Sequence, residues 1–345
     1  MFQFRLDRTV GQTKLKQVNI KSFAANRTTI LKGLKNPLKT PLEDYSTFCE
    51  GKGKDKWLFN RSVFRSFAGG WDSTEQVTSG QQSLFRLALL RATMENCNAY
   101  PDGKCLRYKR LKSYKCFNVE SLTSQFEAYC DMMEEDLEAA PIQKGLSKIV
   151  RMDSRTLSEY KDARKFDLCI TSPPYLNTFD YSDVYRPELF LSGFVANNQE
   201  LMKIRLKTLR SHVQANWERP TRNDFGVLYS KILKEVEAKK DDLWSNRIPA
   251  MIQAYFEDLE RLLIALKSKA NTNATLKIVV ATSAYAGVIV PVDLIIADIA
   301  ENTGWQLEKV QTIRRLRSSA QLWKHENLHD TAQELRESIV ILKSA

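Results

Sequence analysis

The sequence predicts an α/β fold preceded by a mainly helical, basic region, and two observations support this. From Leu146 onward, short apolar segments of strand length alternate with longer segments of helical spacing, as in an α/β sheet with parallel strands. Before that point apolar residues recur at helical spacing, and residues 1–41 carry nine Lys and Arg against one acidic residue. We therefore expect a helical region 1–145 and an α/β region 146–345.

The individual elements follow from the apolar spacing along the chain. Helices are predicted over 81–98 and 119–139, with a polar surface loop at 98–117 between them. Strands of the α/β region are predicted at 149–152, 166–171, 276–281, 305–314 and 337–342. The segments between these strands are predicted as a helix or loop at 154–165, a basic helical insert at 195–270 that includes an amphipathic helix at 248–270, and a helix at 292–303.

The composition is that of a soluble globular protein, with 43% hydrophobic and 27% charged residues in a chain of 345. No apolar run reaches the ~18 residues of a membrane helix, and Met1–Lys16 lacks the apolar centre of a secretion signal, so we expect a cytoplasmic protein. The six cysteines form no CxxC pair and the chain has three histidines. We therefore expect reduced thiols and no metal site.

The net charge of +11 favours a polyanionic partner. The basic residues gather in residues 1–41 and again in Lys203–Arg222, which carries six Lys and Arg against Glu218. A basic face in contact with solvent alone is the alternative interpretation of both segments.

The most informative segment is Ser172-Pro173-Pro174-Tyr175, which directly follows the apolar segment 166–171. Two consecutive prolines remove two backbone donors and hold the chain in a stiff extended turn. At the carboxyl end of a strand in an open α/β sheet, such a turn lies where these sheets bind ligands.

With Thr171 before it, this segment resembles motif IV of DNA methyltransferases that use S-adenosylmethionine to modify exocyclic amines, cytosine N4 or adenine N6. The resemblance covers roughly residues 146–343 and implies a Rossmann-like sheet. It implies that the Ser172 hydroxyl and the Pro173 carbonyl accept the two N–H groups of the target amine, and that Tyr175 stacks on the flipped base. The form that begins with Ser is more usual in the cytosine-N4 group.

The resemblance also implies roles for residues outside the motif. Asp153 and Thr171 correspond to positions near the cofactor, although Asp153 fits a helix N-cap equally well. Basic residues in the insert and near the last strands would contact DNA, unless they merely face solvent. This DNA-binding set is Arg205, Lys207, Arg210, Arg314, Arg315 and Arg317.

One part of the family pattern is missing, namely the glycine-rich cofactor loop after a first apolar strand. The glycine pair in Phe67-Ala-Gly-Gly70 follows a segment too short and polar for a central strand, so we interpret it as a loop unrelated to the cofactor. The sheet is then incomplete, or it is completed by a second subunit that carries the glycine-rich motif.

The expected function is methyl transfer from S-adenosylmethionine to double-stranded DNA at cytosine N4, as part of a restriction-modification system. Adenine N6 is the alternative target. A DNA-binding remnant without activity, and a methyltransferase acting on RNA or protein, are the alternatives of other classes. The intact SPPY sequence argues against the remnant, and the Ser form with the basic insert favours DNA.

Overall fold

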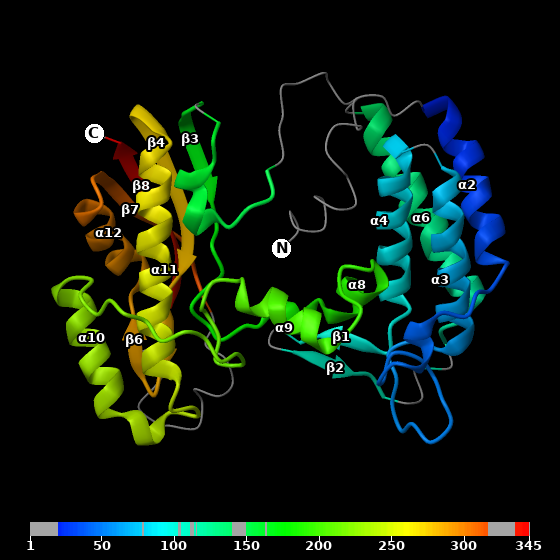
Figure 1. The fold of residues 1–345 in the computed structure, drawn as a ribbon, viewed down its shortest axis with the longest axis horizontal. Helices are drawn as coiled ribbons and strands as arrows, with labels where there is room; N and C mark the ends of the chain where they lie inside the picture. The colour runs from blue at the N-terminus through cyan, green and yellow to red at the C-terminus, as the bar shows by residue number, and fades with distance from the viewer. Residues whose placement is uncertain are drawn as a thin grey trace. The chain divides into compact units, whose positions relative to one another are not determined.

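The computed structural model describes residues 20–77, 79–102, 105–110, 114, 116–139, 150–162, 164–316 and 335–344 (Figure 1). The chain forms two compact units. Unit 1 comprises Met1–Arg151 and Tyr181–Leu201, and unit 2 comprises Met152–Asp180 and Met202–Ala345. The sequence placed a boundary at 145/146, whereas the structure divides the chain at 151/152 and assigns residues 181–201 to unit 1.

Unit 1 is built mainly from helices. The four longest are α2 (Ile20–Leu34), α3 (Arg61–Ser73), α4 (Ser79–Glu95) and α6 (Val119–Ala139). The shorter elements are η2 (Pro41–Asp44), η3 (Thr74–Gln76), β1 (Ala99–Pro101), β2 (Leu106–Tyr108), α7 (Tyr181–Val184) and α8 (Arg186–Leu191). Phe23, Phe85 and Phe126 are buried where α2, α4 and α6 meet, and these contacts account for the apolar spacing of the sequence.

The glycine pair Gly69-Gly70 lies inside α3, so the prediction of a loop there was wrong. Glycines stand at these two positions because helices α2 and α3 cross closely there. A Cβ atom at Gly69 would overlap the backbone carbonyls of Asn36 and Gly33, and one at Gly70 would lie 2.9 Å from Leu34 Cδ2. The glycines therefore let α3 approach α2, which a sequence pattern read locally does not reveal.

The predicted surface loop at 98–117 contains a short antiparallel hairpin, in which β1 pairs with β2 from Ala99–Tyr108 to Pro101–Leu106. Asn98 and Tyr114, which flank the hairpin, are buried. The loop interpretation was therefore incomplete, because three-residue strands are too short to show a period of two.

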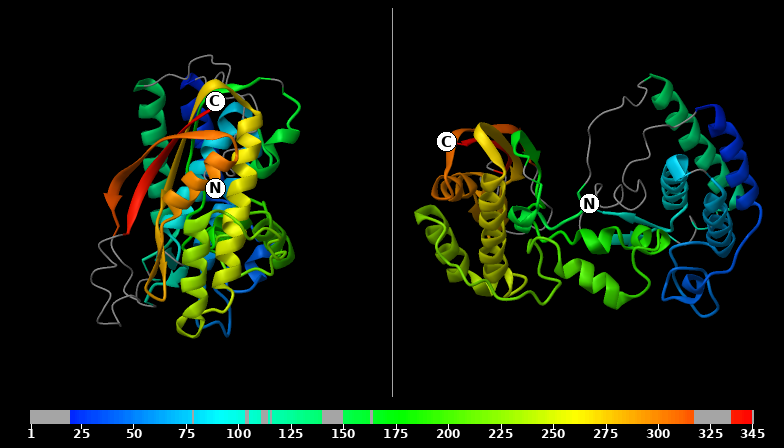
Figure 2. Two further views of the ribbon diagram at one scale, coloured as in Figure 1. Left: turned by 90° about the vertical axis from the view of Figure 1, so that its left-hand side faces the viewer. Right: turned by 45° about the horizontal axis from the view of Figure 1, so that its top comes forward.

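Unit 2 has a four-stranded mixed sheet in the order β3-β4-β8-β7 (Figures 1 and 2). Its strands are β3 (Phe166–Thr171), β4 (Ala270–Ala281), β7 (Trp305–Arg315) and β8 (Arg336–Ser344). The other elements of the unit are η4 (Ser154–Glu159), α10 (Val227–Ala238), η5 (Lys240–Asp242), α11 (Ile248–Ser268), β5 (Ser283–Tyr285), β6 (Val288–Val290) and α12 (Val292–Asn302). Helix α9 (Asn198–Leu206) begins in residues assigned to unit 1 and ends in residues assigned to unit 2.

The α/β fold is confirmed, but the sheet is mixed. In this sheet only the β3–β4 pairing is parallel, whereas β8 is antiparallel to both of its neighbours, β4 and β7. The predicted strand at 149–152 is also corrected, because residues 150–152 are not in a strand and residue 149 lies outside the described part. The predicted helix at 248–270 is confirmed as α11.

The two faces of this sheet differ in burial. Leu276 and Ile278 of β4 and Val340 of β8 point into a core shared with α10, α11 and α12. The strand register places Leu168 and Ile170 of β3 on the opposite face, where their exposed fractions are 54% and 67%. We call this second face the open face of the sheet.

Among the described residues, no helix combines the length and the apolar character needed to cross a membrane.

Candidate active site

The SPPY turn, Ser172–Tyr175, follows the last residue of β3. Thr171 pairs with Ile278 of β4, so the turn begins at the carboxyl end of the two parallel strands. Ser172 is exposed, Pro173 is buried, and Tyr175 is half-buried. The sequence therefore predicted the location of the turn in the sheet correctly. It could do so because the strand and the rigid proline pair that define the turn are contiguous in the sequence.

Donors from the neighbouring core hold the turn in place. The Pro174 carbonyl accepts a hydrogen bond from the Tyr255 hydroxyl of α11 at 3.0 Å, and the Leu176 carbonyl accepts one from the Tyr285 hydroxyl of β5 at 2.8 Å. Burial raises the pKa of Tyr285, so its hydroxyl stays protonated as a donor. The turn is thus fixed from the interior of unit 2.

The resemblance names two acceptor oxygens of the turn, the Ser172 hydroxyl and the Pro173 carbonyl. The Ser172 hydroxyl donates to the Val279 carbonyl of β4 at 3.2 Å, which leaves the lone pairs of its oxygen as acceptors. Within the described residues, no hydrogen bond to the Pro173 carbonyl is found. An amine that brings two N–H groups to this turn would therefore meet two acceptors.

Tyr175 is fixed through its hydroxyl, which the sequence did not reveal. The hydroxyl donates to Glu337 Oε1 of β8 at 2.5 Å, and Arg314 of β7 donates from Nε to Glu337 Oε2 at 2.7 Å. Hydrogen bonds from Tyr175 and from Arg314 outweigh burial and hold the pKa of Glu337 below its ordinary value. Arg314, predicted to contact DNA, thus lies in the same cluster as the SPPY turn.

The chain that follows the turn is fixed by a second cluster. Thr178 has a positive φ of 62° and donates its N–H to the Ser211 carbonyl at 3.1 Å. Next to it, Arg205 Nε lies 2.7 Å from Asp180 Oδ2, and His212 Nε2 lies 4.0 Å from Asp180 Oδ1. Burial lowers the pKa of His212 more than the nearby carboxylate raises it, so the imidazole is neutral near pH 7.

Arg210, another residue of the predicted DNA-binding set, is buried in an ion-pair network. Its Nη2 lies 2.5 Å from Glu257 Oε2 and 2.8 Å from Asp258 Oδ1, both on α11. Because both carboxylates form ion pairs with the guanidinium in the interior of the unit, we remove Arg210 from the DNA-binding set and assign it a structural role.

Asp153, predicted near the cofactor, is the N-cap of η4 and belongs to the same network. Arg155 binds Asp153 with Nη2–Oδ2 at 2.6 Å and reaches Asp258 with Nη1–Oδ2 at 3.0 Å. Burial would raise the pKa of Asp153, but the hydrogen bonds from Arg155 lower it further than burial raises it. The geometry therefore favours the N-cap alternative for this residue.

The remaining members of the predicted DNA-binding set differ in exposure, and one of them lies outside the described residues. Lys207 and Arg315 are exposed, and Arg205 is largely covered beside Asp180. Arg317 lies outside the described residues. Lys207 and Arg315 are thus the members of the set that are exposed and form no ion pair with a carboxylate within the described part of the chain.

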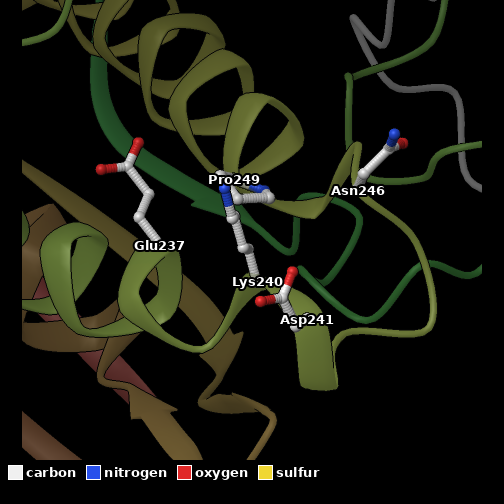
Figure 3. A pocket seen from close by; sticks show the side chains of 5 residues that line it. All are labelled: Glu237, Lys240, Asp241, Asn246 and Pro249. Atoms are coloured by element: carbon white, nitrogen blue, oxygen red, sulfur yellow. The ribbon is translucent and has the colours of Figure 1, made fainter.

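A cavity of about 610 Å³ lies where α10 and η5 meet the start of α11 (Figure 3). Its lining comprises Glu237, Lys240, Asp241, Asn246 and Pro249, none of which belongs to the SPPY turn or its anchors. The mixed charge of this lining favours no single ligand class, so we do not include it in the candidate site.

Comparison with known proteins shows that the chain is similar to Type II methyltransferases. The chain is 33% identical over 153 residues to M.AvaI of Nostoc sp. and of Anabaena variabilis, which covers 42% of this chain and 32% of each relative. It is 23% identical over 318 residues to M.BsoBI of Geobacillus stearothermophilus, which covers 79% of this chain and 61% of the relative. The chain therefore spans about a third of the length of M.AvaI and about three fifths of M.BsoBI. No protein-family model and no solved structure matches it.

Sequence reasoning missed the anchors of the turn, above all Glu337 and Tyr255. Glu337 stands at the polar start of the strand-like segment ESIVIL, and a carboxylate that opens a buried strand is the signal that could have marked it. Tyr255 lies on the apolar face of α11, where only its hydroxyl distinguishes it from an ordinary core residue.

Proposed function

We propose that this chain is the base-binding and catalytic part of a DNA methyltransferase of a restriction-modification system, which methylates the exocyclic amine of a base at cytosine N4. Adenine N6 is the alternative target. The observation that carries the proposal is the SPPY turn at the carboxyl end of β3, where the Ser172 hydroxyl and the Pro173 carbonyl belong to adjacent residues. The similarity to Type II methyltransferases supports it.

In this proposal the turn prepares the amine for attack. An amine conjugated to a base ring is a weak nucleophile, because its lone pair is delocalised. When the Ser172 oxygen and the Pro173 carbonyl each accept one N–H, the nitrogen is drawn toward tetrahedral geometry and its lone pair is aimed outward. Tyr175 offers a ring face on which the extruded base stacks. No covalent nucleophile is needed.

S-Adenosylmethionine would supply the methyl group, and the residues predicted near it account for only part of its binding site. The Asp153 carboxylate is occupied by Arg155, and the register places Thr171 on the helix-covered face of the sheet beside Ile278. We therefore keep Thr171 as a residue near the cofactor and propose that the glycine-rich part of the pocket comes from a second subunit or another segment.

The edge of the sheet supports such a second subunit. Within the described strands, β3 pairs only with β4, and its apolar side chains Leu168 and Ile170 are mostly exposed. Parallel strands usually occur in sheets that are covered on both faces. A partner that adds a strand beside β3 would extend the sheet next to the strand that leads into the SPPY turn, and a helix of that partner packed over the open face would bury both side chains.

The test is to express the chain in a host without DNA methylation, alone and with the product of the neighbouring reading frame, and to analyse the nucleosides of its DNA. We expect N4-methylcytosine with the partner, and its loss in Ser172→Ala and Tyr175→Ala but not in the exposed control Ser158→Ala. N6-Methyladenine would select the alternative target. Unmodified DNA in every case, together with DNA binding by the purified chain, would favour a non-catalytic DNA-binding remnant.

A further inference from the structure

Tyr175, Glu337 and Arg314 form one connected cluster at the end of the sheet. Parallel strands β3 and β4 end there, and the antiparallel strand β8 begins there, so a residue near the start of β8 lies beside the SPPY turn. Glu337 pairs with Ala281 of β4 on one side and with Arg314 of β7 on the other. Its exposed fraction is 9%, whereas the Arg314 side chain is mostly exposed.

The residues on both sides of Glu337 fix the strand from the other face. Arg336 donates from Nε to Asp293 Oδ2 at 2.8 Å, and Ser338 donates from its hydroxyl to the same oxygen at 2.8 Å. Asp293 is fully buried in the first turn of α12. Because side chains alternate along a strand, anchoring 336 and 338 to α12 directs Glu337 to the opposite, open face.

We propose that Glu337 is a positioning residue for Tyr175: it sets the plane of the ring on which the target base stacks, and Arg314 in turn holds the Glu337 carboxylate. This inference rests on the proposed function, because it assigns a role to the anchor of the same turn. It also gives Arg314 a role within the protein in place of the predicted contact to DNA.

The chemistry of the cluster suits this role. A phenol hydroxyl bound to a carboxylate makes a strong, charge-assisted hydrogen bond that fixes the direction of the Cβ–Cγ axis of the ring. Because the phenol O–H prefers to lie in the plane of the ring, a fixed acceptor also favours one ring plane. The restraint acts at the hydroxyl end, so the hydrogen bond itself occupies neither face of the ring. A ring already held in one plane loses less rotational freedom when the base binds, so less binding energy is spent on ordering it.

The first experiment needs no methyl transfer. Full-length chain labelled with ¹³C-tyrosine is compared by NMR with Tyr175→Phe, which identifies the Tyr175 signal by its absence. We expect the Tyr175 signal to shift in Glu337→Ala, to shift less in Glu337→Gln, which keeps an acceptor oxygen, and to remain in place in Glu308→Ala, an exposed carboxylate on β7. A Tyr175 signal that is unchanged in Glu337→Ala overturns the proposal.

The second experiment measures methylation kinetics in the presence of the partner. We expect Glu337→Ala to lower kcat about tenfold or more while KM for DNA changes little, with Glu337→Gln intermediate. In a Tyr175→Phe background, Glu337→Ala should cause no further loss, because the hydroxyl through which it acts is gone. Independent losses that multiply in the double variant would overturn the proposal.

The two experiments separate this inference from the proposed function. If wild-type protein shows no methylation but the Tyr175 signal responds to Glu337 as expected, the positioning contact stands and the proposed function fails. If methylation occurs and the Tyr175 signal ignores Glu337, the proposed function stands and the positioning role fails.

Discussion

Replacing Arg210 with Ala should destabilise unit 2 by about 3–5 kcal/mol, the cost of breaking a buried ion pair. The Arg210 side chain is 8% exposed, and its removal leaves the carboxylates of Glu257 and Asp258 in the interior with one cation fewer. Asp258 would keep only Arg155 as an ion-pair partner among the described residues. For a unit of about 170 residues, a loss of this size lowers Tm by roughly 6–20 °C.

Thermal unfolding followed by circular dichroism measures the change in Tm, and hydrogen exchange of peptides from α11 assigns it to unit 2. The matched control is Arg261→Ala, which removes another partner of Glu257, at 3.5 Å, but from a side chain that is 55% exposed. An exposed ion pair contributes about 1 kcal/mol or less, so this control should change Tm by no more than a few degrees. Equal Tm values for the two variants, with weaker DNA binding in Arg210→Ala alone, would refute the structural role and return Arg210 to the DNA-binding set.

Three further predictions concern other parts of the chain. Gly69→Ala should destabilise unit 1 by about 3 kcal/mol, because its Cβ overlaps backbone carbonyls of α2 and the loop after it. Urea unfolding checks this, with Gly51→Ala as the control, because the nearest atoms to a Cβ there belong to the flexible side chain of Lys54. Lys207→Ala should reduce the slope of log affinity for DNA against log salt by about one, as measured by fluorescence anisotropy, and an unchanged slope would show that Lys207 contacts no phosphate. Burial would raise the pKa of Glu257, but hydrogen bonds from Arg210 and Thr221 outweigh it and lower the pKa from 4.5 to about 2. The ionised Glu257 should therefore stabilise unit 2 above pH 4.5, and this stabilisation should be lost as the pH falls toward 2. Acid titration of the circular dichroism signal measures the loss.

The elements that the sequence predicted well are those whose periodicity is long and uninterrupted. Helix α11 and strand β4 bury a regular apolar face over many residues, so their spacing reflects their final environment. Helix α3 was missed because Gly69-Gly70 is read locally as a breaker, whereas its role is a close approach to α2. Local propensity carries no information about a helix that lies more than thirty residues earlier in the chain.

The same distinction holds for the candidate site. The SPPY turn was placed correctly, because the strand and the two prolines that define it are contiguous in sequence. Its anchor Glu337 lies 162 residues away, and only the pairing of β8 between β4 and β7 brings the two together. Arg210 entered the DNA-binding set because a count of charges does not show which cations face a carboxylate in the interior.

The position of β8 has a consequence for the order in which unit 2 can assemble during synthesis. This strand is made after β3, β4 and β7, yet it separates β4 from β7 in the sheet, and those two strands do not pair with each other. Until β8 leaves the ribosome, β7 lacks its neighbour and the parallel pair β3–β4 is the only part of the sheet that can exist. The nascent chain must therefore keep β7 and the β8-facing edge of β4 unpaired for the time needed to translate residues 316–344, which makes this interval the period when a chaperone would be most useful.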